Sequence, residues 1–596
     1  MRFVKFIKNN LLIIGAFIVL ILLSISNVNR AFIDVPYLDG LMQVPTVEKY
    51  FNGTLIFSDI SKRWGEHRLI GYTLIFLLNT VLFGLNMKME PFVFVLVYSL
   101  IGLVLYFCFK NIFKEIFKDK FKKLIDILYL PILFIVFSLV HPPGMLMTTQ
   151  FVVGTLFFVL VSKYFDRICL NSNKWLDLFL FLILIFLYIA VFSGANFGGM
   201  VLAFVLCFLF KIFFSDKKKP SFYCLISIFF TLFLFVVYFK STRVDYDGIS
   251  LFEKITVFFN KFGESFKSIL SGISSTTLDV HTFEDALGGR EILVLINGSV
   301  LLLIGIYSIF KYIFLKMYKF TYFPFFLMVY SLGHILSTRL GRLDGGWMQP
   351  MSEWYSFHLY FYVIGTLWIL FYDFLKKYGQ ISKKNFKSLI WKYKFNLIIF
   401  IFILGWIFSF QIFSNLAQWH RGPYVKQWLE PKKVALLYPT DENLEYLLWT
   451  KEESLEAIRI LKKYKLSVFR GENSANLVKL YGWYNDNWIN KSARAIIKSG
   501  LDGVVSINVS LPKETFNKTY NNLLKMQILV NEKVIKEQIF SDGFFDEGSV
   551  DIIFEVPKNQ ELNLEIKLDK SFIPKDFDLG KDSRELGIII SRIEIK

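Results

Sequence analysis

The chain has 596 residues, of which 54% are hydrophobic and 18% aromatic, and its mean hydropathy is +0.48. Soluble chains carry about 45–50% apolar residues, so this composition excludes an ordinary soluble enzyme and indicates a polytopic α-helical membrane protein. The formal net charge of +18 would by itself fit a nucleic-acid partner. The lysines, however, gather in short loops between apolar runs, at residues 110–123, 163–174, 211–219, 311–319 and 376–394. This is the positive-inside pattern of membrane proteins, and it predicts no nucleic-acid partner.

Eleven apolar runs are long enough to cross a bilayer as helices, which takes about 20 residues each. They cover residues 11–27, 91–109, 124–140, 147–165, 175–192, 197–214, 221–239, 293–314, 321–338, 353–375 and 395–414. The first run follows a basic N-terminus and lacks a small-residue cleavage site, so we expect a retained span rather than a cleaved signal. The lysine loops then predict a cytoplasmic N-terminus, with residues 28–90 and everything after residue 415 outside.

The first polar interlude, residues 28–68, carries many ionisable groups for a segment beside the bilayer. They are Asp34, Asp39, Glu48, Asp59, Lys62, Arg63, Glu66, His67 and Arg68. A single crossing by the next apolar segment, residues 69–86, would turn every later lysine loop outward. We therefore expect this segment to lie along the outer interface or to re-enter and return. The alternative is that residues 69–86 form an ordinary span and that the later lysine loops depart from the positive-inside rule, which is a statistical tendency.

Two further outer loops carry informative patterns. In residues 240–290, apolar side chains from Leu251 to Ile269 recur at helical spacing. This predicts a helix that lies flat in the headgroup region or, as an alternative, packs on the protein's own surface. In residues 338–347, Arg339 and Arg342 lie near glycines in a loop that we expect on the outer side. The positive-inside rule accounts only for basic residues in cytoplasmic loops, so it does not explain these arginines. A guanidinium binds two phosphate oxygens, so we expect a phosphate site there, with headgroup anchoring as the alternative.

An outward-facing carboxylate with arginines nearby fits sugar transfer from a lipid phosphate. The carboxylate takes the proton of an acceptor hydroxyl as that hydroxyl attacks the anomeric carbon, and cations stabilise the departing phosphate. Asp39 is the candidate base, and a helix cap or an interfacial salt bridge is its alternative role. No set of His, Cys and carboxylate residues has metal-ligand spacing. We therefore expect no cofactor, with a divalent metal as an open alternative.

Several short motifs occur in order along the chain: Asp39, Glu66-His67-Arg68, Gln150, Ser193-Gly194 and Gly341-Arg342. Together they resemble bacterial glycosyltransferases of the GT-C superfamily, multi-span enzymes that use polyprenyl-phosphate sugars. The resemblance implies a catalytic base at Asp39, with Asp34 as its substitute and Glu66 nearby. It implies substrate contacts at Trp64, His67, Arg68, Gln150 and Tyr355. Relatives have a second acidic residue where this chain has Gly40, and Arg-Tyr where it has Trp354-Tyr355, which leaves Arg339 and Arg342 as the candidate phosphate-binding residues.

The C-terminal part predicts a helix over residues 440–464, capped at Thr440 or Asp441, followed by a β-rich region. Compact or alternating apolar runs follow at residues 493–498, 503–509, 524–530, 533–539, 550–555, 561–567 and 585–594. This spacing predicts an antiparallel β-sandwich with a hairpin turn at Asn531-Glu532. Residues 482–489 and 582–586 resemble the jelly-roll, carbohydrate-binding-like domain of some bacterial glycosyltransferases. Trp483, Tyr484 and Trp488 are its candidate glycan-binding residues, with core and edge positions of the sandwich as the alternative.

These predictions give a GT-C-like transmembrane catalytic domain at residues 1–415, a helical connector at 416–475 and an extracytoplasmic β-sandwich at 476–596. The predicted function is inverting transfer of a sugar from a polyprenyl-phosphate carrier to a cell-surface glycan or teichoic-acid-like acceptor. The reaction would take place on the outer side of the bacterial cytoplasmic membrane. The alternatives are a flippase or transporter of lipid-linked sugars and a polysaccharide polymerase. The predicted partners are the lipid-linked donor, the acceptor glycan and the bilayer.

Overall fold

The computed structural model describes residues 10–595 with gaps. The gaps are residues 37–38, 65–66, 69, 118–121, 139–147, 171–174, 193–197, 215–221, 243–250, 279–290, 342–345, 352–356, 379–385, 438, 440–442, 445–446, 449, 471–476, 480–481, 485, 501, 542–543, 546–547 and 581. By packing, the chain divides into two compact units: Met1–Lys433 with Thr440–Ser467, and Val434–Pro439 with Val468–Lys596. The domain boundaries expected at residues 415 and 475 remain predictions.

Each of the eleven predicted spans overlaps a helix of the first unit. The helices are α2 (Leu11–Ala31), α7 (Met89–Phe117), α8 (Lys122–Val136), α9 (Thr148–Cys169), α10 (Trp175–Leu187) with its π-helical end η2 (Tyr188–Phe192), α11 (Gly198–Phe214), α12 (Phe222–Thr242), α15 (Glu291–Phe314), α16 (Phe323–Gly341), α18 (Phe361–Tyr378) and α19 (Phe386–Leu437). Among the described residues, six of the helical segments are long and apolar enough to cross a membrane: those of α2, α7, α10–η2, α15, α18 and α19. Three shorter apolar helices, α6 (Ile70–Phe83), α11 and α12, accompany them.

One end of this helical unit gathers lysines and their acidic or polar partners. Lys110, near the end of α7, donates to Asn10 Oδ1 at 2.6 Å and lies 3.6 Å from Asp126 of α8. Lys211 of α11 donates to the carbonyl of Cys169 at the end of α9. Lys311 of α15 pairs with Asp373 of α18. Further contacts join these pairs into one region: Phe113 with Tyr372, Tyr312 with Thr321, and Thr321 with Asp166. We call this region the lysine end.

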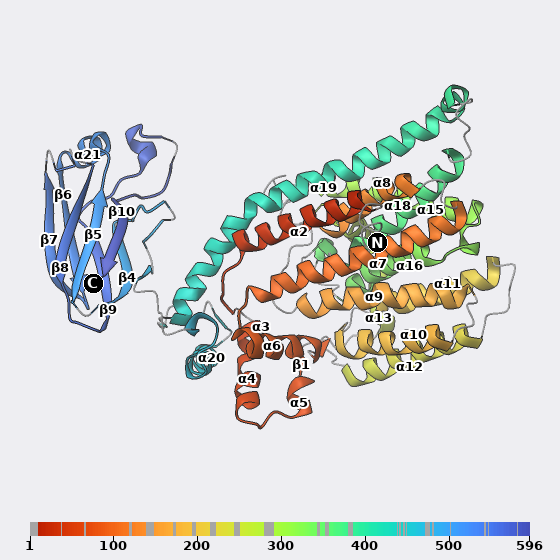
Figure 1. The fold of residues 1–596 in the computed structure, drawn as a ribbon, viewed down its shortest axis with the longest axis horizontal. Helices are drawn as coiled ribbons and strands as arrows, with labels where there is room; N and C mark the ends of the chain where they lie inside the picture. Colours follow the sequence, from red (N-terminus) through yellow and green to blue (C-terminus); the bar gives the residue numbers. More distant parts are fainter. Residues whose placement is uncertain are drawn as a thin grey trace, which may run out of the picture. The chain divides into compact units, whose positions relative to one another are not determined.

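The opposite end, here called the interlude end, carries the first polar interlude. The interlude forms short elements: α3 (Asp39–Met42), α4 (Val44–Phe51), α5 (Phe57–Ile60) and a two-stranded hairpin of β1 (Arg63–Trp64) and β2 (His67–Arg68). Figure 1 shows these elements with α6 at one end of the long helices. The starts of α7 and α9 also lie there, because Met87, just before α7, donates to Asp34, and Gln150 of α9 donates to the Arg68 carbonyl of the hairpin.

Helix α6 begins and ends at the interlude end. Its first turn is tied to the start of α9 by a hydrogen bond from Tyr72 N to Gln150 Oε1 (3.1 Å). Beyond its last turn, Met87 N donates at 2.8 Å to Asp34, which lies just after α2. Its 14 residues span roughly 21 Å, less than the roughly 30 Å of a hydrocarbon core. The segment 69–86 therefore does not carry the chain to the lysine end.

The apolar stripe expected after Leu251 forms two helices, α13 (Leu251–Asn260) and α14 (Phe262–Ser274). The buried face of α14 includes Ser265, Ser268, Ser271 and Ser274, whereas Phe262 and Phe266 are exposed. Close packing of α14 on α15 requires Gly298, since a Cβ there would lie 2.1 Å from the Leu270 carbonyl oxygen. Helix α14 thus turns its hydroxyls toward the protein and its aromatic rings away from it.

The second unit contains two antiparallel sheets around one apolar core. Strands β10 (Ile589–Ile595), β5 (Val504–Ser510) and β8 (Ser549–Glu555) form one sheet in that order. The other has the order β3 (Leu477–Lys479), β4 (Ser492–Lys498), β9 (Glu561–Leu568), β6 (Leu523–Val530) and β7 (Lys533–Ser541). All seven predicted strands are confirmed. The hairpin at Asn531 and Glu532 is confirmed as well, with φ of 48° and 67°, as a type I′ turn requires.

The helix predicted over residues 440–464 begins later than expected. It is α20 (Lys451–Lys463), and Thr450 caps it by accepting the Glu453 amide at 3.2 Å. The expected caps, Thr440 and Asp441, lie outside the described residues. The prediction failed on the start because Leu444, Leu447 and Leu448 are buried without belonging to the helix, so an apolar pattern alone placed the helix too early.

Candidate functional site

Asp39, the candidate base, is the first residue of α3. The structure describes its backbone but not its side chain, and the same is true of Trp64 and His67, whose backbones pair across the hairpin. Glu66, Arg342 and Tyr355 lie outside the described residues, as do Ser193 and Gly194. The roles predicted for these residues remain predictions.

Asp34, the substitute base, connects two loops at the interlude end. Its Oδ1 accepts the Met87 amide at 2.8 Å and the Ser467 hydroxyl at 3.4 Å. The Ser467 amide donates to the carbonyl of Gly84 at 2.9 Å. These bonds hold the turn after α6 against the segment that follows α20. The contacts of Asp34 are those of a structural brace.

Gln150 contacts Arg68, and both residues are predicted substrate contacts. The side chain is fully buried near the start of α9. Its Nε2 donates to the Arg68 carbonyl at 3.0 Å, and its Oε1 accepts the Tyr72 amide at 3.1 Å. Gln150 therefore fixes the path of the backbone from the hairpin into α6. The structure brings these predicted residues together through the backbone of the interlude.

A buried carboxyl group next to this bond was not expected from the sequence. Glu90 is the second residue of α7 and is 1% exposed. Its Oε2 accepts the Thr149 hydroxyl at 3.2 Å, and its Oε1 has no hydrogen-bond partner among the described residues. Nearby, Thr73 of α6 donates to Gln43 at 3.2 Å. The sequence feature that could have pointed to Glu90 is its position at the start of an apolar run. An acidic residue there either interacts with the positive end of the helix dipole or is buried for a functional reason.

Arg339, a candidate phosphate-binding residue, lies near the end of α16 and is 2% exposed. Its Nη1 donates to the carbonyl of Gly346 at 3.4 Å, across the arginine–glycine loop. The α16 end also lies at the interlude end, because α16 starts at the lysine end. Phosphate binding by Arg339 remains a prediction.

A buried group of histidines and tyrosines packs around the part of α16 before Arg339, and sequence reasoning missed it. Tyr330 Oη lies 2.7 Å from His358 Nδ1 and 3.1 Å from Tyr188 Oη. The rings of His334 and His358 are 4.5 Å apart between centroids. Gly199 of α11 allows this packing, since a Cβ there would lie 2.6 Å from the His334 amide nitrogen. Histidine inside an apolar run was the signal, because ionisable groups in membrane-type helices are rare and commonly functional.

Charged side chains of α4 and α20 hold these two elements of the first unit together. Glu48 accepts from Lys463 at 2.9 Å and from Arg459 at 2.8 Å. Tyr464 stacks on Phe51 with ring centroids 4.6 Å apart. The bonds from Lys463 and Arg459 hold the pKa of the Glu48 carboxyl below its ordinary value. Helix α20 therefore braces the segment that directly follows α3 and Asp39.

The candidate glycan-binding aromatics are partly buried at the edge of the β-sheet core. Trp483 donates to the Arg494 carbonyl at 2.7 Å, and Tyr484 donates to the Glu585 carbonyl at 2.9 Å. Trp488 contacts Phe572 edge-on, with centroids 5.8 Å apart. These are the contacts of structural edge residues, and glycan binding remains a prediction for them.

Arg584 orders the neighbouring turn of the β-sheet unit. Its guanidinium pairs with Asp486 at 2.7 Å and with Asp582 at 2.6 Å, and it lies 4.8 Å from the ring centre of Tyr484. The bonds from Arg584 lower the pKa of both carboxyls. The two carboxylates are therefore already paired within the protein.

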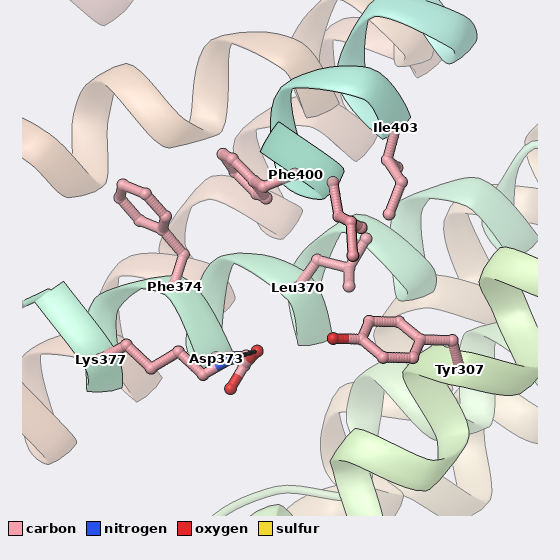
Figure 2. A pocket seen from close by; sticks show the side chains of 8 residues that line it. Tyr307, Leu370, Asp373, Phe374, Lys377, Phe400 and Ile403 are labelled. Atoms are coloured by element: carbon pink, nitrogen blue, oxygen red, sulfur yellow. Dashed lines mark hydrogen bonds and ion pairs between the residues drawn. The ribbon is translucent and has the colours of Figure 1, made fainter. Parts of the chain in front are cut away.

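A pocket at the lysine end is lined by Tyr307, Asp373 and Lys377 with apolar side chains of α18 and α19 (Figure 2). Lys377 donates to Asp373 at 2.7 Å, and Lys311 lies 3.6 Å from the same carboxylate. The pocket lies at the opposite end of the unit from Arg339. It therefore has no part in the predicted sugar-transfer site.

These features define a multi-helix apolar protein, of the composition that multi-pass membrane proteins have, with a C-terminal two-sheet antiparallel β domain. The chain matches no protein-family model, no curated protein sequence and no solved structure at a significant level.

Proposed function

We propose that the chain is an integral-membrane glycosyltransferase that moves a sugar from a polyprenyl phosphate to a glycan acceptor on the outer side of the cytoplasmic membrane. The observation that carries this proposal is the clustering of polar groups at one end of the apolar bundle. The interlude with Asp39 and Arg68, the buried Gln150 and the buried Arg339 all belong to the interlude end. Lys110, Lys211 and Lys311 lie at the other end.

The proposed reaction is a single displacement with inversion. The acceptor hydroxyl oxygen forms a bond to the anomeric carbon while the bond from that carbon to the phosphate oxygen breaks. The Asp39 carboxylate takes the hydroxyl proton. The electron pair of the broken bond leaves with the phosphate, whose added charge Arg339 and Arg342 stabilise. Trp64, Glu66, His67, Arg68 and Tyr355 would shape the sugar site, and Gln150 would act by holding the backbone at Arg68 and Tyr72.

Asp39→Asn tests the proposal most directly. We expect it to abolish transfer from undecaprenyl-monophosphate sugars while membrane insertion is retained, because an amide cannot take up the proton. Asp59→Asn is the matched control, since Asp59 is an acid of the same interlude that pairs with Lys49 at 2.5 Å. Transfer at the wild-type rate by Asp39→Asn would refute the assignment of the base.

The proposal includes a topology of eleven crossings with the N-terminus in the cytoplasm. Its support is the positive-inside rule together with the path of α6, which returns to the interlude end. A periplasm-type reporter, such as alkaline phosphatase, fused after Asn86 should then be active outside the cell. An expressed but inactive fusion would contradict the combination of a cytoplasmic N-terminus and a non-crossing α6.

The buried histidines favour a second candidate, a transporter of lipid-linked sugars. His334 and His358 lie within the helical bundle beside Tyr330 and Tyr188, and transporters place binding groups inside the bundle. The two candidates differ in products. Reconstituted vesicles that move the donor across the bilayer without breaking its sugar–phosphate bond would identify the transporter.

A further inference from the structure

The inward face of α19 carries a row of neutral polar side chains. Gln411 and Ser414 are fully buried, and Gln418 is 7% exposed. Their spacing of three and four residues places them on one side of the helix. The opposite side exposes Ile412, Phe413 and Leu416. Figure 1 shows α19 beside α2 in the helical unit. We call the row of Gln411, Ser414 and Gln418, together with Asn27 of α2, which lies beside Gly422 one turn beyond Gln418, the α19 seam.

Part of the surrounding polar network is satisfied within the protein. Asn297 of α15 donates to the hydroxyls of Ser274 (2.9 Å) and Thr277 (3.0 Å) and accepts from Trp406 of α19 (3.0 Å). Such bonds are what polar residues contribute when they only hold helices together. This cluster therefore shows what simple helix packing looks like in this protein.

The seam differs from that cluster because three of its oxygens lack partners. Asn27 Oδ1, Gln411 Oε1 and Ser414 Oγ are buried and have no hydrogen-bond partner among the described residues. The amide of Gln411 does donate to the Ser138 hydroxyl, so the side chain is anchored while its oxygen stays unused. Buried polar atoms without partners cost free energy, and an apolar side chain at each position would avoid that cost.

The chemistry of these atoms selects the class of ligand. The two amide oxygens only accept hydrogen bonds, and the serine hydroxyl both donates and accepts, so the ligand must present several donors. Each side chain of the seam is uncharged, which does not suit a phosphate or a metal ion. A neutral compound rich in hydroxyl groups fits this description.

The position of the seam agrees with the proposed function. Ser138 follows α8, which starts at the lysine end, so Ser138 lies at the interlude end. Asn27 lies four residues before the last residue of α2, which is also at the interlude end. The seam is thus at the end of the bundle where the acceptor would arrive.

We propose that the α19 seam binds the hydroxyl groups of the neutral glycan acceptor, between α19, α2 and the end of α8. That this glycan is the acceptor of a transfer reaction rests on the proposed function. That the seam binds a neutral glycan rests on the seam alone. The unsatisfied oxygens of Asn27, Gln411 and Ser414 accept hydrogen bonds from its hydroxyl groups.

Thermal unfolding of the full chain in lipid nanodiscs tests the seam. The probe is an equimolar mixture of neutral trisaccharides of glucose, galactose and N-acetylglucosamine. We expect the mixture to raise the unfolding midpoint of the wild type. Ser414→Ala should bind the probe about fivefold more weakly, and Gln411→Leu with Ser414→Ala about thirtyfold more weakly, since one and two hydrogen bonds are lost.

Ser308→Ala is the matched control, because the Ser308 hydroxyl is equally buried but donates to Ile304 of its own helix at 2.9 Å. It should bind the probe like the wild type. Without probe, Ser414→Ala should unfold at the wild-type midpoint or above, since no bond is lost. Three results would each overturn the seam. They are a lowered unfolding midpoint of Ser414→Ala without probe, a wild-type midpoint that the probe does not shift, and a probe-induced shift in the double variant equal to that of the wild type.

The same preparations separate this inference from the proposed function. Sugar transfer from undecaprenyl monophosphate without a probe-induced shift would refute the seam and leave the glycosyltransferase standing. A probe-induced shift that needs Gln411 and Ser414, in a protein that transfers no sugar, would refute the glycosyltransferase and leave the seam as a glycan-binding site.

Discussion

At the residue scale, the seating of the interlude depends on the buried amide of Gln150. Gln150→Leu would leave the Arg68 carbonyl and the Tyr72 amide without their partner. Each buried polar group that loses its partner costs about 1–3 kcal/mol. We expect a lower unfolding midpoint in nanodiscs and faster hydrogen exchange at the start of α6.

Two variants sharpen this prediction. Gln150→Glu keeps the acceptor for the Tyr72 amide but places a fully buried carboxylate against the Arg68 carbonyl oxygen, so it should be destabilising as well. Ser99→Ala is the control, because the Ser99 hydroxyl donates within its own helix to Val95 at 2.7 Å. A Gln150→Leu protein as stable as Ser99→Ala would show that this bond does not hold the interlude.

The limits of sequence reasoning are also clearest at this scale. The sequence named Gln150 and Arg68 as neighbours in a site, and the structure joins them, but through a backbone carbonyl 82 positions away. Long-range pairing of this kind leaves no local pattern. The same holds for Glu48, whose partner Arg459 is 411 positions distant, and for the unsatisfied oxygens of the α19 seam. Burial of individual polar atoms depends on the packing of several helices, which periodicity does not encode.

At the element scale, α20 holds α4 through a carboxylate whose charge can be removed by acid. The folded pKa of Glu48 is lowered, so its contribution is present above the unfolded value of about 4.3 and is lost as the pH falls through the folded value. We expect the α4–α20 distance to stay constant from about pH 8 to pH 5 and to increase below about pH 4. Spin labels at Tyr50 and Leu455, both exposed, would report it.

Glu456 must be separated from this effect, because it also accepts from Arg459 at 2.6 Å and its pKa is also lowered. Glu48→Gln removes the charge from the contact with α4 and should give a longer distance that no longer changes between pH 5 and pH 3. Glu456→Gln should retain the pH response. A response that persists in Glu48→Gln would assign it to another group.

At the scale of the whole molecule, local patterns predicted most of the architecture. Apolar runs identified segments such as α7 and α15 because a helix that faces lipid must be apolar along its own length. Alternation identified strands such as β5, whose buried residues Val505, Ile507 and Val509 are two apart. The short helices α3 to α5 were not predicted, because few apolar residues define them and their contacts with distant segments hold them in place.

The second compact unit gives a prediction about its stability in isolation. Its strands surround a core of their own that includes Ile507, Ile528 and Ile566. We therefore expect residues 468–596 to fold alone as a soluble β protein with a cooperative unfolding transition.

Ile566→Ala should destabilise this fragment by about 2–5 kcal/mol, because the side chain is fully buried in β9. Ile553→Ala, at a strand position that is 58% exposed, should change stability by less than about 0.5 kcal/mol. Denaturant unfolding followed by circular dichroism measures both. A fragment without a cooperative transition, or equal effects of the two substitutions, would show that the β-sheet core needs the helical unit in order to form.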